Sequence, residues 1–461
     1  MHFLKQLLAV AAIAVSTLAG AEPGVTGTTI TLGMSSPFTG PNGAYGLDMR
    51  QVIESYFDQV NKSGGVNGRK VSLLALDDGY ETDRTVANTN ALINDKKVFA
   101  LLAYYGSSPT TEAMNKVFGP ARVPLVGTIS GAGSLREPIS QNPGSRYMFN
   151  VRASYADETE AIVNQLVSLG LKNIAVFYQN DGFGKSGLDG VTAALKKHNL
   201  APTASATVER NSVEVASAVD AIARTKPQAV VMVTLYKPTA AFVRAMKAAG
   251  QSPMFMTLSP VGTEQLVKEL GADARGIGIS QVMPYPWNDI VPMVRDYQKL
   301  IGNKANSSYY GIEAYVMARI TVDALRRAGK DPSREKFMEA LESTNADLGG
   351  FRVAFSASNR QGSRFVEMTV VGPGGKILKE PQPAVNIRKR PVFTGRFRFQ
   401  ARRQAVPCGP SSSTIPPAFN SSRMRSASAK FRAFLAAARS AIKVVMATSS
   451  RPPAPATPLR R

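Results

Sequence analysis

Apolar and polar residues follow one another along the chain in two alternating periods. Compact apolar runs, such as residues 98–103 and 229–235, predict strands that are buried on both faces. Between such runs, apolar residues recur at helical spacing, as in residues 47–60 and 82–95. Strands that alternate with helices predict parallel sheets covered by helices on both faces. The same patterns predict further strands at residues 29–34, 70–76, 123–126, 173–178, 254–258 and 276–282, and further helices at residues 109–118, 157–169, 187–198, 213–224 and 239–249.

This order of elements occupies about 350 residues, which is too much for a single hydrophobic core. We therefore predict an α/β protein with two doubly wound lobes. The pattern stops near residue 380. Residues 381–461 hold 16 of the 55 Lys and Arg residues, 11 of the 29 Pro residues and no acidic residue. This composition predicts a disordered tail at 380–461. A functional interpretation is a basic arm that binds anionic surfaces. A non-functional interpretation is a segment translated out of frame.

The formal net charge of +22 suggests a nucleic-acid partner at first sight. Without the tail, however, 39 basic residues face 33 acidic ones, so the charge of the remaining chain is nearly balanced. We therefore predict no nucleic-acid partner for the body of the protein.

The first 21 residues have the pattern of an export signal. Lys5 precedes an apolar run at residues 7–18, and Ala19-Gly20-Ala21 offers a cleavage site with small residues at both ends. The run is shorter than the ~20 residues that cross a bilayer. We expect cleavage near Ala21 and a soluble mature protein in the periplasm.

Two histidines and one cysteine limit the chemistry of the chain. His2 lies in the expected leader and Cys408 in the tail, so the body offers His198 alone, which we interpret as a solvated surface residue. Histidine-rich metal sites, Cys–His nucleophile pairs and disulfide frameworks are therefore excluded. We interpret the adjacent acids Asp157 and Glu158 as loop or helix-cap residues. The sequence thus indicates no enzyme, no metal and no cofactor.

Loops that follow the predicted strands carry the candidate site, because ligands of open α/β sheets bind beyond the carboxyl ends of the strands. These loops are rich in hydroxyl, glycine and aromatic residues, which suit a small molecule with polar ends and an apolar body. Ser107 and Ser108 lie at the start of a predicted helix, where hydroxyls and free amides form a carboxylate site. The loops are residues 37–45, 104–110, 128–134, 179–185, 236–239 and 258–262.

Six segments in this order resemble the periplasmic substrate-binding proteins of ABC transporters, in the leucine/isoleucine/valine-binding branch. The resemblance covers residues 28–379 and implies a periplasmic binding protein type I fold, with two lobes joined by three crossovers around a ligand cleft. The implied N-terminal lobe comprises 28–150 and 283–350, and the C-terminal lobe 151–282 and 351–379. The segments are GPNGAYG (40–46), VNKSGGVNGRKV (60–71), YYGSSPT (104–110), NVRASYADE (150–158), VFYQNDGFGKSGL (176–188) and YKPTAAFVRAMKAAG (236–250).

The resemblance also implies which residues line the cleft. Ser107 and the loop 130–132 would bind a ligand α-carboxylate on the first lobe. Tyr45 would lie in a loop at the cleft mouth, and Tyr236 and Phe183, also in loops, would close from the second lobe. The implied ligand-binding residues are Tyr45, Tyr105, Ser107, Ser108, Ser130, Gly131, Ala132, Tyr155, Phe183, Tyr236, Ser259 and Tyr310.

Two of these residues depart from the family pattern. Ala132 stands where branched-chain amino-acid binders have a hydroxyl residue, and Ser259 stands where they have a glutamate that pairs with the ligand ammonium. Either another acid such as Asp157 serves the ammonium, or the ligand is not a standard amino acid. Tyr310 would lie near the side-chain pocket, and Tyr155 is either a cleft residue or a packing residue of the crossover.

The resemblance implies an exported receptor of an ABC importer. Such a protein captures an amino acid (branched-chain or otherwise apolar) or a related small carboxylate by lobe closure and delivers it to a membrane permease. The alternative is a ligand-sensing or regulatory protein on the same fold. We expect a monomer whose partners are the small ligand and the permease.

Overall fold

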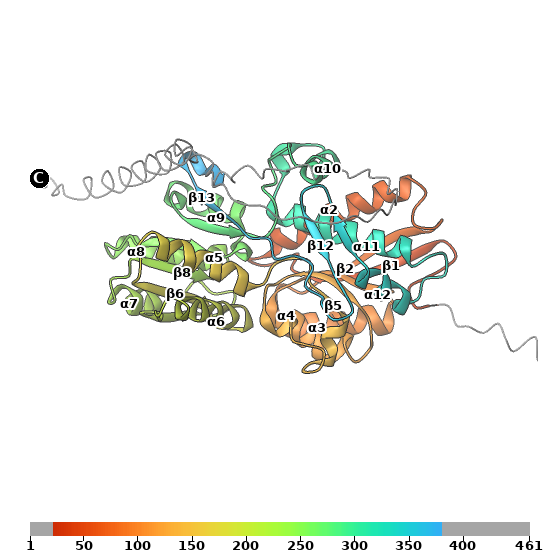
Figure 1. Cartoon of the computed structure of the whole chain (residues 1–461), viewed down its shortest axis with the longest axis horizontal. Coiled ribbons are helices and arrows are strands. Elements are labelled where there is room, and N and C mark those ends of the chain that lie inside the picture. Colours follow the sequence, from red (N-terminus) through yellow and green to blue (C-terminus); the bar gives the residue numbers. More distant parts are fainter. Residues whose placement is uncertain (1–21, 380–461) are drawn as a thin grey trace, which may run out of the picture. The chain divides into compact units, whose positions relative to one another are not determined.

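The computed structural model describes residues 22–379, which lie within one compact unit of the chain (Figure 1). The predicted leader at 1–21 and the predicted tail at 380–461, which includes Cys408, lie outside the described residues. Within the described range, no helix is both long and apolar enough to cross a membrane.

The first sheet is entirely parallel, with strand order β2-β1-β3-β4-β5. All residues of the inner strands β3 and β4 are buried, which is why these strands appear in the sequence as apolar runs. The strands are β1 (Thr29–Ser36), β2 (Lys70–Asp77), β3 (Ala100–Tyr105), β4 (Leu125–Ile129) and β5 (Met148–Phe149).

Helices cover both faces of this sheet, and together they form the first lobe. Helices α2 and α11 pack against each other on one face, and α3 and α4 pack together on the other (Figure 1). A π-helical turn extends each of α3 and α4, at Ala91–Asp95 and Met114–Phe118. The helices are α2 (Gly43–Lys62), α3 (Thr82–Asn90), α4 (Ser107–Ala113), α10 (Pro292–Ile301), α11 (Tyr309–Arg327) and α12 (Arg334–Glu342).

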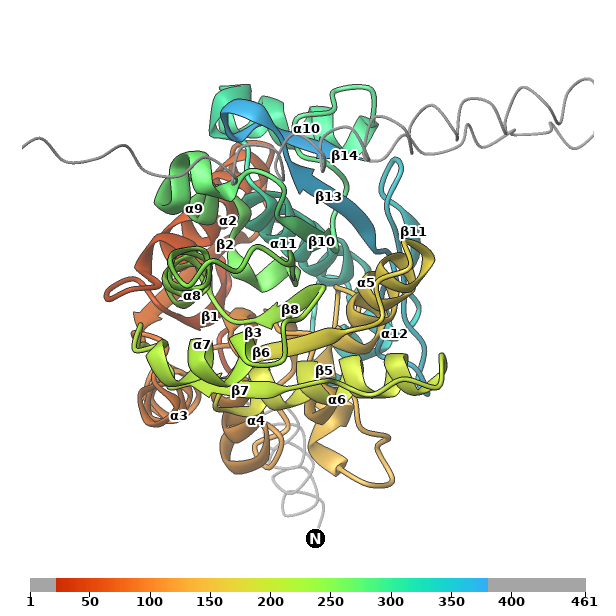
Figure 2. The same ribbon diagram turned by 90° about the vertical axis from the view of Figure 1, so that its left-hand side faces the viewer.

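The second sheet is mixed, with strand order β14-β13-β10-β9-β8-β6-β7. Strands β13 and β14, blue in Figure 2, lie far from β10 in the sequence and extend the sheet beyond it. Strand β13 pairs antiparallel with β10, and β14 pairs antiparallel with β13. The strands are β6 (Ile174–Gln179), β7 (Ser205–Val208), β8 (Ala229–Val233), β9 (Met254–Thr257), β10 (Gly278–Gln281), β13 (Glu367–Val371) and β14 (Ile377–Lys379). With this sheet, the second lobe contains helices α5 (Tyr155–Ser168), α6 (Gly182–Lys196), α7 (Ala216–Ala223), α8 (Tyr236–Ala248) and α9 (Thr263–Leu270).

The chain passes between the two lobes three times, after β5, after β10 and before β13. The first and third crossovers bond to each other, because the Asn150 amide donates to the Arg360 carbonyl (2.9 Å) and the Gly362 amide donates to the Asn150 carbonyl (2.7 Å). A separate hairpin of β11 (Asn345–Asp347) and β12 (Arg352–Ala354) precedes the third crossover. The boundaries given above for the lobes stay a prediction.

Strands β3 and β4 share a kink just before the candidate site. Ala103 lies opposite Gly127 in the strand register, and both have positive φ, +54° and +74°. A Cβ atom at position 127 would lie 2.5 Å from Met317 on α11, so the close approach of helix and strand requires glycine. The kink directly precedes Tyr105 at the end of β3 and Ser130 after β4.

Five helices begin earlier than the sequence patterns indicate, and in α2, α6 and α8 this corrects the position of a site residue. Tyr45, Phe183 and Tyr236, expected in loops, lie in the first turns of α2, α6 and α8. Asp181 caps α6 by accepting hydrogen bonds from two backbone amides, and Pro238 fits the first turn of α8, where its missing N–H is not needed. Glycine and proline in these segments therefore mark helix starts rather than loops.

His198, which we interpreted as a solvated residue, follows the end of α6. It is half-buried, and its Nε2 atom lies 2.7 Å from Oδ1 of Asn164 on α5. It thus makes a local contact between two helices of the second lobe.

Candidate functional site

Three buried hydroxyl groups meet where the first lobe joins the first crossover. Oγ of Ser107, the first residue of α4, lies 2.8 Å from Oγ of Ser130 and 3.4 Å from the hydroxyl of Tyr155. The Ala132 amide donates to Ser130 Oγ (3.2 Å). Ser107, Ser130 and Tyr155 are each at most 1% exposed. The arrangement offers several hydrogen-bond donors at one point, as a carboxylate requires.

Gly131 and Arg136 hold this hydroxyl cluster in place. The Gly131 carbonyl accepts a hydrogen bond from the Tyr155 amide (2.8 Å), and a Cβ atom at 131 would lie 2.5 Å from Tyr155. The Nη atoms of Arg136 donate to the carbonyls of Ser130 and Ala132 and to two carbonyls of the crossover. Burial lowers the pKa of Arg136 to about 10. The sequence patterns did not identify this arginine.

Four tyrosines form a continuous aromatic cluster beside the hydroxyls. The ring of Tyr45 stacks on Tyr310 (4.6 Å between centroids) and on Tyr105 (5.7 Å), and meets Tyr236 edge to face (5.7 Å). Tyr45 is fully buried rather than exposed at a cleft mouth, because rings from both lobes surround it. Burial raises the pKa of Tyr45, Tyr105 and Tyr310 well above 10, so these hydroxyls stay neutral.

Hydrogen bonds join the two lobes around this cluster. The phenols of Tyr45 and Tyr310 donate to carbonyls of the 3-10 turn Ser259–Val261 in the second lobe (2.7 and 2.9 Å). In the opposite direction, Tyr236 donates to the Pro41 carbonyl of the first lobe (2.9 Å). Predicted site residues from both lobes are thus in direct contact.

Ser108 and Phe183 meet at the start of α6. Ser108 Oγ accepts a hydrogen bond from the Gly182 amide (2.9 Å), which links α4 to α6. The Phe183 ring packs against Tyr155, 5.2 Å between centroids. Phe183 therefore covers the hydroxyl cluster from the second lobe, whereas Ser108 bonds to the backbone of the other lobe.

The two lobes also meet through a second set of polar contacts, which the sequence patterns did not predict. The Gln179 side-chain amide donates to the hydroxyl of Tyr80 (3.0 Å), and the Tyr80 ring meets Tyr105 edge to face (5.2 Å). Arg210 of the second lobe donates to Oγ1 of Thr82 (2.8 Å). Tyr80 has a positive φ of +66° and lies in no predicted strand or loop of the site, so no sequence pattern distinguished it.

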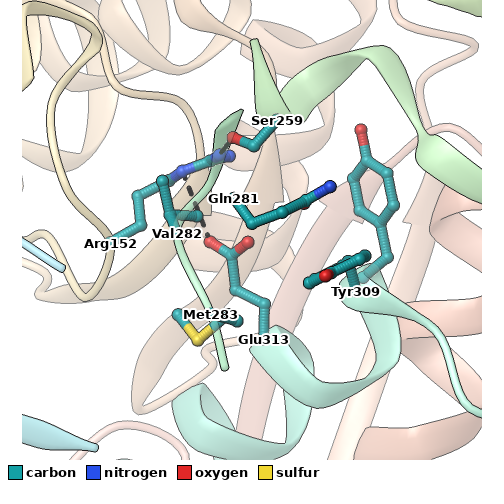
Figure 3. A pocket seen from close by; sticks show the side chains of 8 residues that line it. Arg152, Ser259, Gln281, Val282, Met283, Tyr309 and Glu313 are labelled. Carbon is teal, nitrogen blue, oxygen red and sulfur yellow. Dashed lines mark hydrogen bonds and ion pairs between the residues drawn. The ribbon is translucent and has the colours of Figure 1, made fainter. Parts of the chain in front are cut away.

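A buried ionic cluster lies at a pocket that Tyr310 also lines, and Figure 3 shows its Arg152 and Glu313. Arg152 of the first crossover is 1% exposed, and its guanidinium lies 3.6 Å from both Glu158 and Glu313. It also contacts the hydroxyl of Ser259. Burial opposes the charge of Arg152, but Glu313 and Glu158 outweigh it and raise the pKa of the guanidinium.

The interpretation of Glu158 as a loop or helix-cap residue is wrong. Its carboxylate is fully buried and accepts hydrogen bonds from the Ser259 amide (2.8 Å), the Ser259 hydroxyl (3.0 Å) and the Ser280 hydroxyl (2.6 Å). Burial raises its pKa despite these bonds. Its neighbour Asp157, by contrast, forms the capping box of α5 with Ser154, which confirms the cap interpretation for that residue.

Asp157 has partners that occupy its carboxylate. Besides the cap, it accepts two hydrogen bonds from Arg364 (2.7 and 2.9 Å). Burial raises its pKa, but the bonds from Ser154 and Arg364 outweigh burial and hold the pKa below the usual value. The structure thus gives no support to Asp157 as the acid that replaces the family glutamate at position 259.

Arg152 and Glu313 of the ionic cluster line a small pocket. The volume open to the centre of a water molecule is ≈ 10 Å³, which is room for about one water. Figure 3 shows side chains from both lobes and from the crossovers converging on it. The lining residues are Arg152, Ser259, Gln281, Val282, Met283, Tyr309, Tyr310 and Glu313.

Residues 29–376 match the profile of the periplasmic binding protein family. An amino acid binding protein from Pseudomonas aeruginosa is 26% identical over 245 residues, 52% of this chain and 63% of that relative, so the chain spans less than two thirds of its length. A Leu/Ile/Val-binding protein homologue from Brucella abortus is 24% identical over 404 residues, 81% of this chain and 96% of the relative.

A solved structure extends this similarity to the fold. The substrate-binding periplasmic protein from Ralstonia solanacearum is 33% identical, with a TM-score of 0.71, and the match covers 76% of this chain and 100% of that chain. The predicted type I fold with two lobes is confirmed. The chain belongs to the periplasmic binding protein family, whose members bind solutes and are not enzymes.

Proposed function

We propose that the chain is the exported solute-binding receptor of an ABC importer. It captures an amino acid, branched-chain or otherwise apolar, or a related small carboxylate, and delivers it to a membrane permease. The names of the Pseudomonas and Brucella relatives support the ligand class. The leader pattern at residues 1–21 supports export to the periplasm, with cleavage near Ala21.

The observation that carries the proposal is the buried hydroxyl cluster of Ser107, Ser130 and Tyr155. The two serine hydroxyls bond to each other, and either of them can be the donor. Each can turn toward an incoming carboxylate without leaving a buried carbonyl unpaired. Such a site needs no cationic side chain, because several donors share the negative charge of the ligand.

The aromatic cluster supplies the apolar part of the site. Tyr45, Tyr105 and Tyr310 come from the first lobe, and Tyr236 and Phe183 come from the second. A ligand that touches residues of both lobes binds the closed form better than an open one, and this difference in affinity shifts the equilibrium toward closure. The closed form is then the one that the permease recognises.

Thermal shift and calorimetry on the purified chain test this proposal. We expect Leu, Ile, Val, Phe or a small carboxylate to raise the melting temperature, since a ligand that binds the native state stabilises it by mass action. Ser107→Ala removes one donor and should weaken binding by about tenfold. Ser168→Ala, at an exposed serine on α5, is the control and should leave the affinity unchanged.

Two results would contradict the proposal in different ways. If no member of the panel shifts the melting temperature, the ligand class is wrong. If a ligand binds Ser107→Ala as tightly as the wild type, the ligand class stands and the hydroxyl cluster is not its site.

A further inference from the structure

Arg136 follows the 3-10 turn Gly133–Leu135 and contacts the loop 130–132 of the candidate site. Its Nη1 atom donates to the carbonyls of Ser130 (3.2 Å) and Ala132 (3.4 Å). Its Nη2 atom donates to two carbonyls of the first crossover (3.0 and 3.3 Å). Its Nε atom is buried and has no hydrogen-bond partner in the range 22–379. All four hydrogen bonds of this guanidinium thus go to neutral acceptors.

The positive charge of Arg136 has no ion-pair partner among the residues that the structure describes. Asp157 and Glu158 are the acids that favour this charge from a distance. Each of them pairs with another arginine, Arg364 or Arg152. Burial and the positive charge of Arg152 outweigh the two acids and lower the pKa of Arg136. A cation that is removed from water without an anion is costly, so an anionic ligand nearby would stabilise it.

Arg136 also determines where the loop directs a backbone amide. In a trans peptide the C=O and N–H bonds point in opposite directions, so a carbonyl that bonds to Arg136 turns the N–H of the next residue away from the guanidinium. For the Ser130 carbonyl that next residue is Gly131. Burial raises the pKa of the Tyr155 hydroxyl, and a hydrogen bond from the Gly131 amide is among the interactions that oppose this rise. The Gly131 N–H is thus directed at the hydroxyl cluster, where we expect the ligand carboxylate.

The second peptide group that Arg136 holds extends to the other lobe. The Ala132 carbonyl accepts a hydrogen bond from Arg136, and the Gly133 amide of the same peptide group donates to Oγ of Ser186 on α6 (3.2 Å). A cation at the carbonyl ends polarises both peptide groups and makes their N–H ends stronger donors. Backbone N–H groups oriented in this way bind anions. Arg136 can therefore favour an anion that it does not touch.

We propose that Arg136 is a positioning residue that determines specificity: its charge, acting through the peptide group of Ser130 and Gly131, makes the site prefer a carboxylate to the neutral amide of the same solute. The neutral donors of the hydroxyl cluster can bind either group, but a carboxylate loses more hydration when it enters the cleft. The charge of Arg136 offsets this loss, and the carboxylate supplies the anion that Arg136 lacks. This inference rests on the proposed function and adds to it the origin of the preference for an anionic solute.

The test measures, by calorimetry on the purified full chain at pH 7, the affinities for Leu, Phe and isocaproate and for the primary amide of each. We expect the wild type to bind at least one acid ~30-fold more tightly than its amide. Arg136→Gln removes the charge and should reduce this preference at least ~10-fold. Arg136→Lys keeps the charge and should retain most of the preference. Arg122→Gln, at an exposed arginine that precedes β4, is the control and should leave the preference unchanged.

The ratio of the two affinities separates this role from a merely structural one. A variant that only loosens the loop 130–132 weakens the acid and the amide alike and leaves their ratio unchanged. Lysine cannot reproduce the fork of donors that reaches four carbonyls, so a structural role predicts equal losses of acid affinity in Arg136→Lys and Arg136→Gln. Equal losses, or an unchanged ratio in Arg136→Gln, would overturn the inference and leave the proposed function intact.

A measurement on the wild type needs no variant to fold. The Gly131 amide should exchange the Tyr155 hydroxyl for a carboxylate oxygen, so its proton NMR signal should move downfield when the acid binds and less when the amide binds. A Gly131 signal that does not respond to a bound acid, or equal affinity of the wild type for acid and amide, overturns the inference alone. If none of the acids binds, the proposed function fails together with the inference.

Discussion

Near the junction of the lobes, the hydrogen bonds of a carboxyl group decide whether its pKa lies below or above the usual value. Asp157 is partly buried, but bonds from Ser154 and Arg364 hold its pKa below the usual value. Glu264 on α9 accepts one bond, from the Tyr309 amide (3.0 Å), and its Oε2 atom has no partner within residues 22–379. Burial raises the pKa of Glu264 to about 7.

This shift predicts how stability depends on pH. Between its usual value of 4.5 and about 7, Glu264 is protonated in the folded protein and ionised in the unfolded chain. Its contribution to stability is therefore present below pH 4.5 and is lost as the pH rises through 7. The groups that face it are Asp48 of α2, whose pKa burial raises to about 6, and Tyr309 of α11.

We therefore predict that Glu264→Gln raises the free energy of unfolding by about 2 kcal/mol at pH 8 and changes it little at pH 4.5. The glutamine oxygen still accepts the bond from Tyr309 and carries no charge. Urea denaturation at both pH values measures the difference. Glu269→Gln, at an exposed acid on the same helix, should show no such pH dependence, and equal effects of the two variants would contradict the prediction.

The sequence identifies only the part of the site that follows strands. Ser130 directly follows β4, and Ser107 follows β3 after one glycine as the first residue of α4; the rule for open sheets selects both places. Arg152, Glu158 and Glu313 become neighbours only when both lobes and a crossover assemble. Charged side chains are usually solvated, so nothing local in the sequence distinguished these three.

At the scale of elements, strands buried on both faces were predicted well, and the largely buried helix α11 was not. The predicted strand at 229–235 corresponds to β8 (Ala229–Val233). Helix α11, for which the sequence patterns predicted no element, buries 15 of its 19 residues. Its exposed or half-buried residues, Arg319, Asp323, Arg326 and Arg327, all lie in the second half, so the first half lacks the regular polar positions that mark an amphipathic helix in a sequence. The strands β11, β12 and β14, of three residues each, are too short for a pattern.

The kink in β3 and β4 leads to a prediction about the packing of α11. Gly127→Ala should lower the free energy of unfolding by about 2 kcal/mol, because an L-residue is disfavoured at φ +74° and the new methyl group displaces Met317. Ala103→Gly should be neutral or stabilising, because φ is also positive there.

Chemical denaturation of the two variants measures these effects. The control is Gly27→Ala, since an added Cβ at position 27 meets no atom within 4 Å. Wild-type stability of Gly127→Ala would show that Met317 and the strand adjust without cost, and would contradict the prediction.

At the scale of the whole molecule, a few hydrogen bonds between side chains and backbone hold the lobes together. The phenols of Tyr45 and Tyr310 bind the Val261 and Pro260 carbonyls of one short turn. Because each bond contributes about 1 kcal/mol, the balance between closed and open forms is sensitive to single atoms.

We predict that Tyr45→Phe combined with Tyr310→Phe shifts the ligand-free protein toward open forms, by ~30-fold in the ratio of populations. The rings and their stacking remain, so the change reports on the two hydroxyls. Small-angle X-ray scattering should show a larger radius of gyration than for the wild type. Tyr178→Phe, on β6 within the second lobe, is the control, and an unchanged radius in the double variant would contradict the prediction.

The bonded crossovers have a consequence for how the receptor family can diversify. Since Asn150 pairs with the segment around Arg360 and Gly362, two of the three connections bend as one ribbon. We expect such a paired connection to limit the relative motion of the lobes to a hinge rotation. We therefore expect that substitutions in the cleft can change the solute without changing the path of closure. Ligand choice and lobe closure would then depend on separate sets of residues.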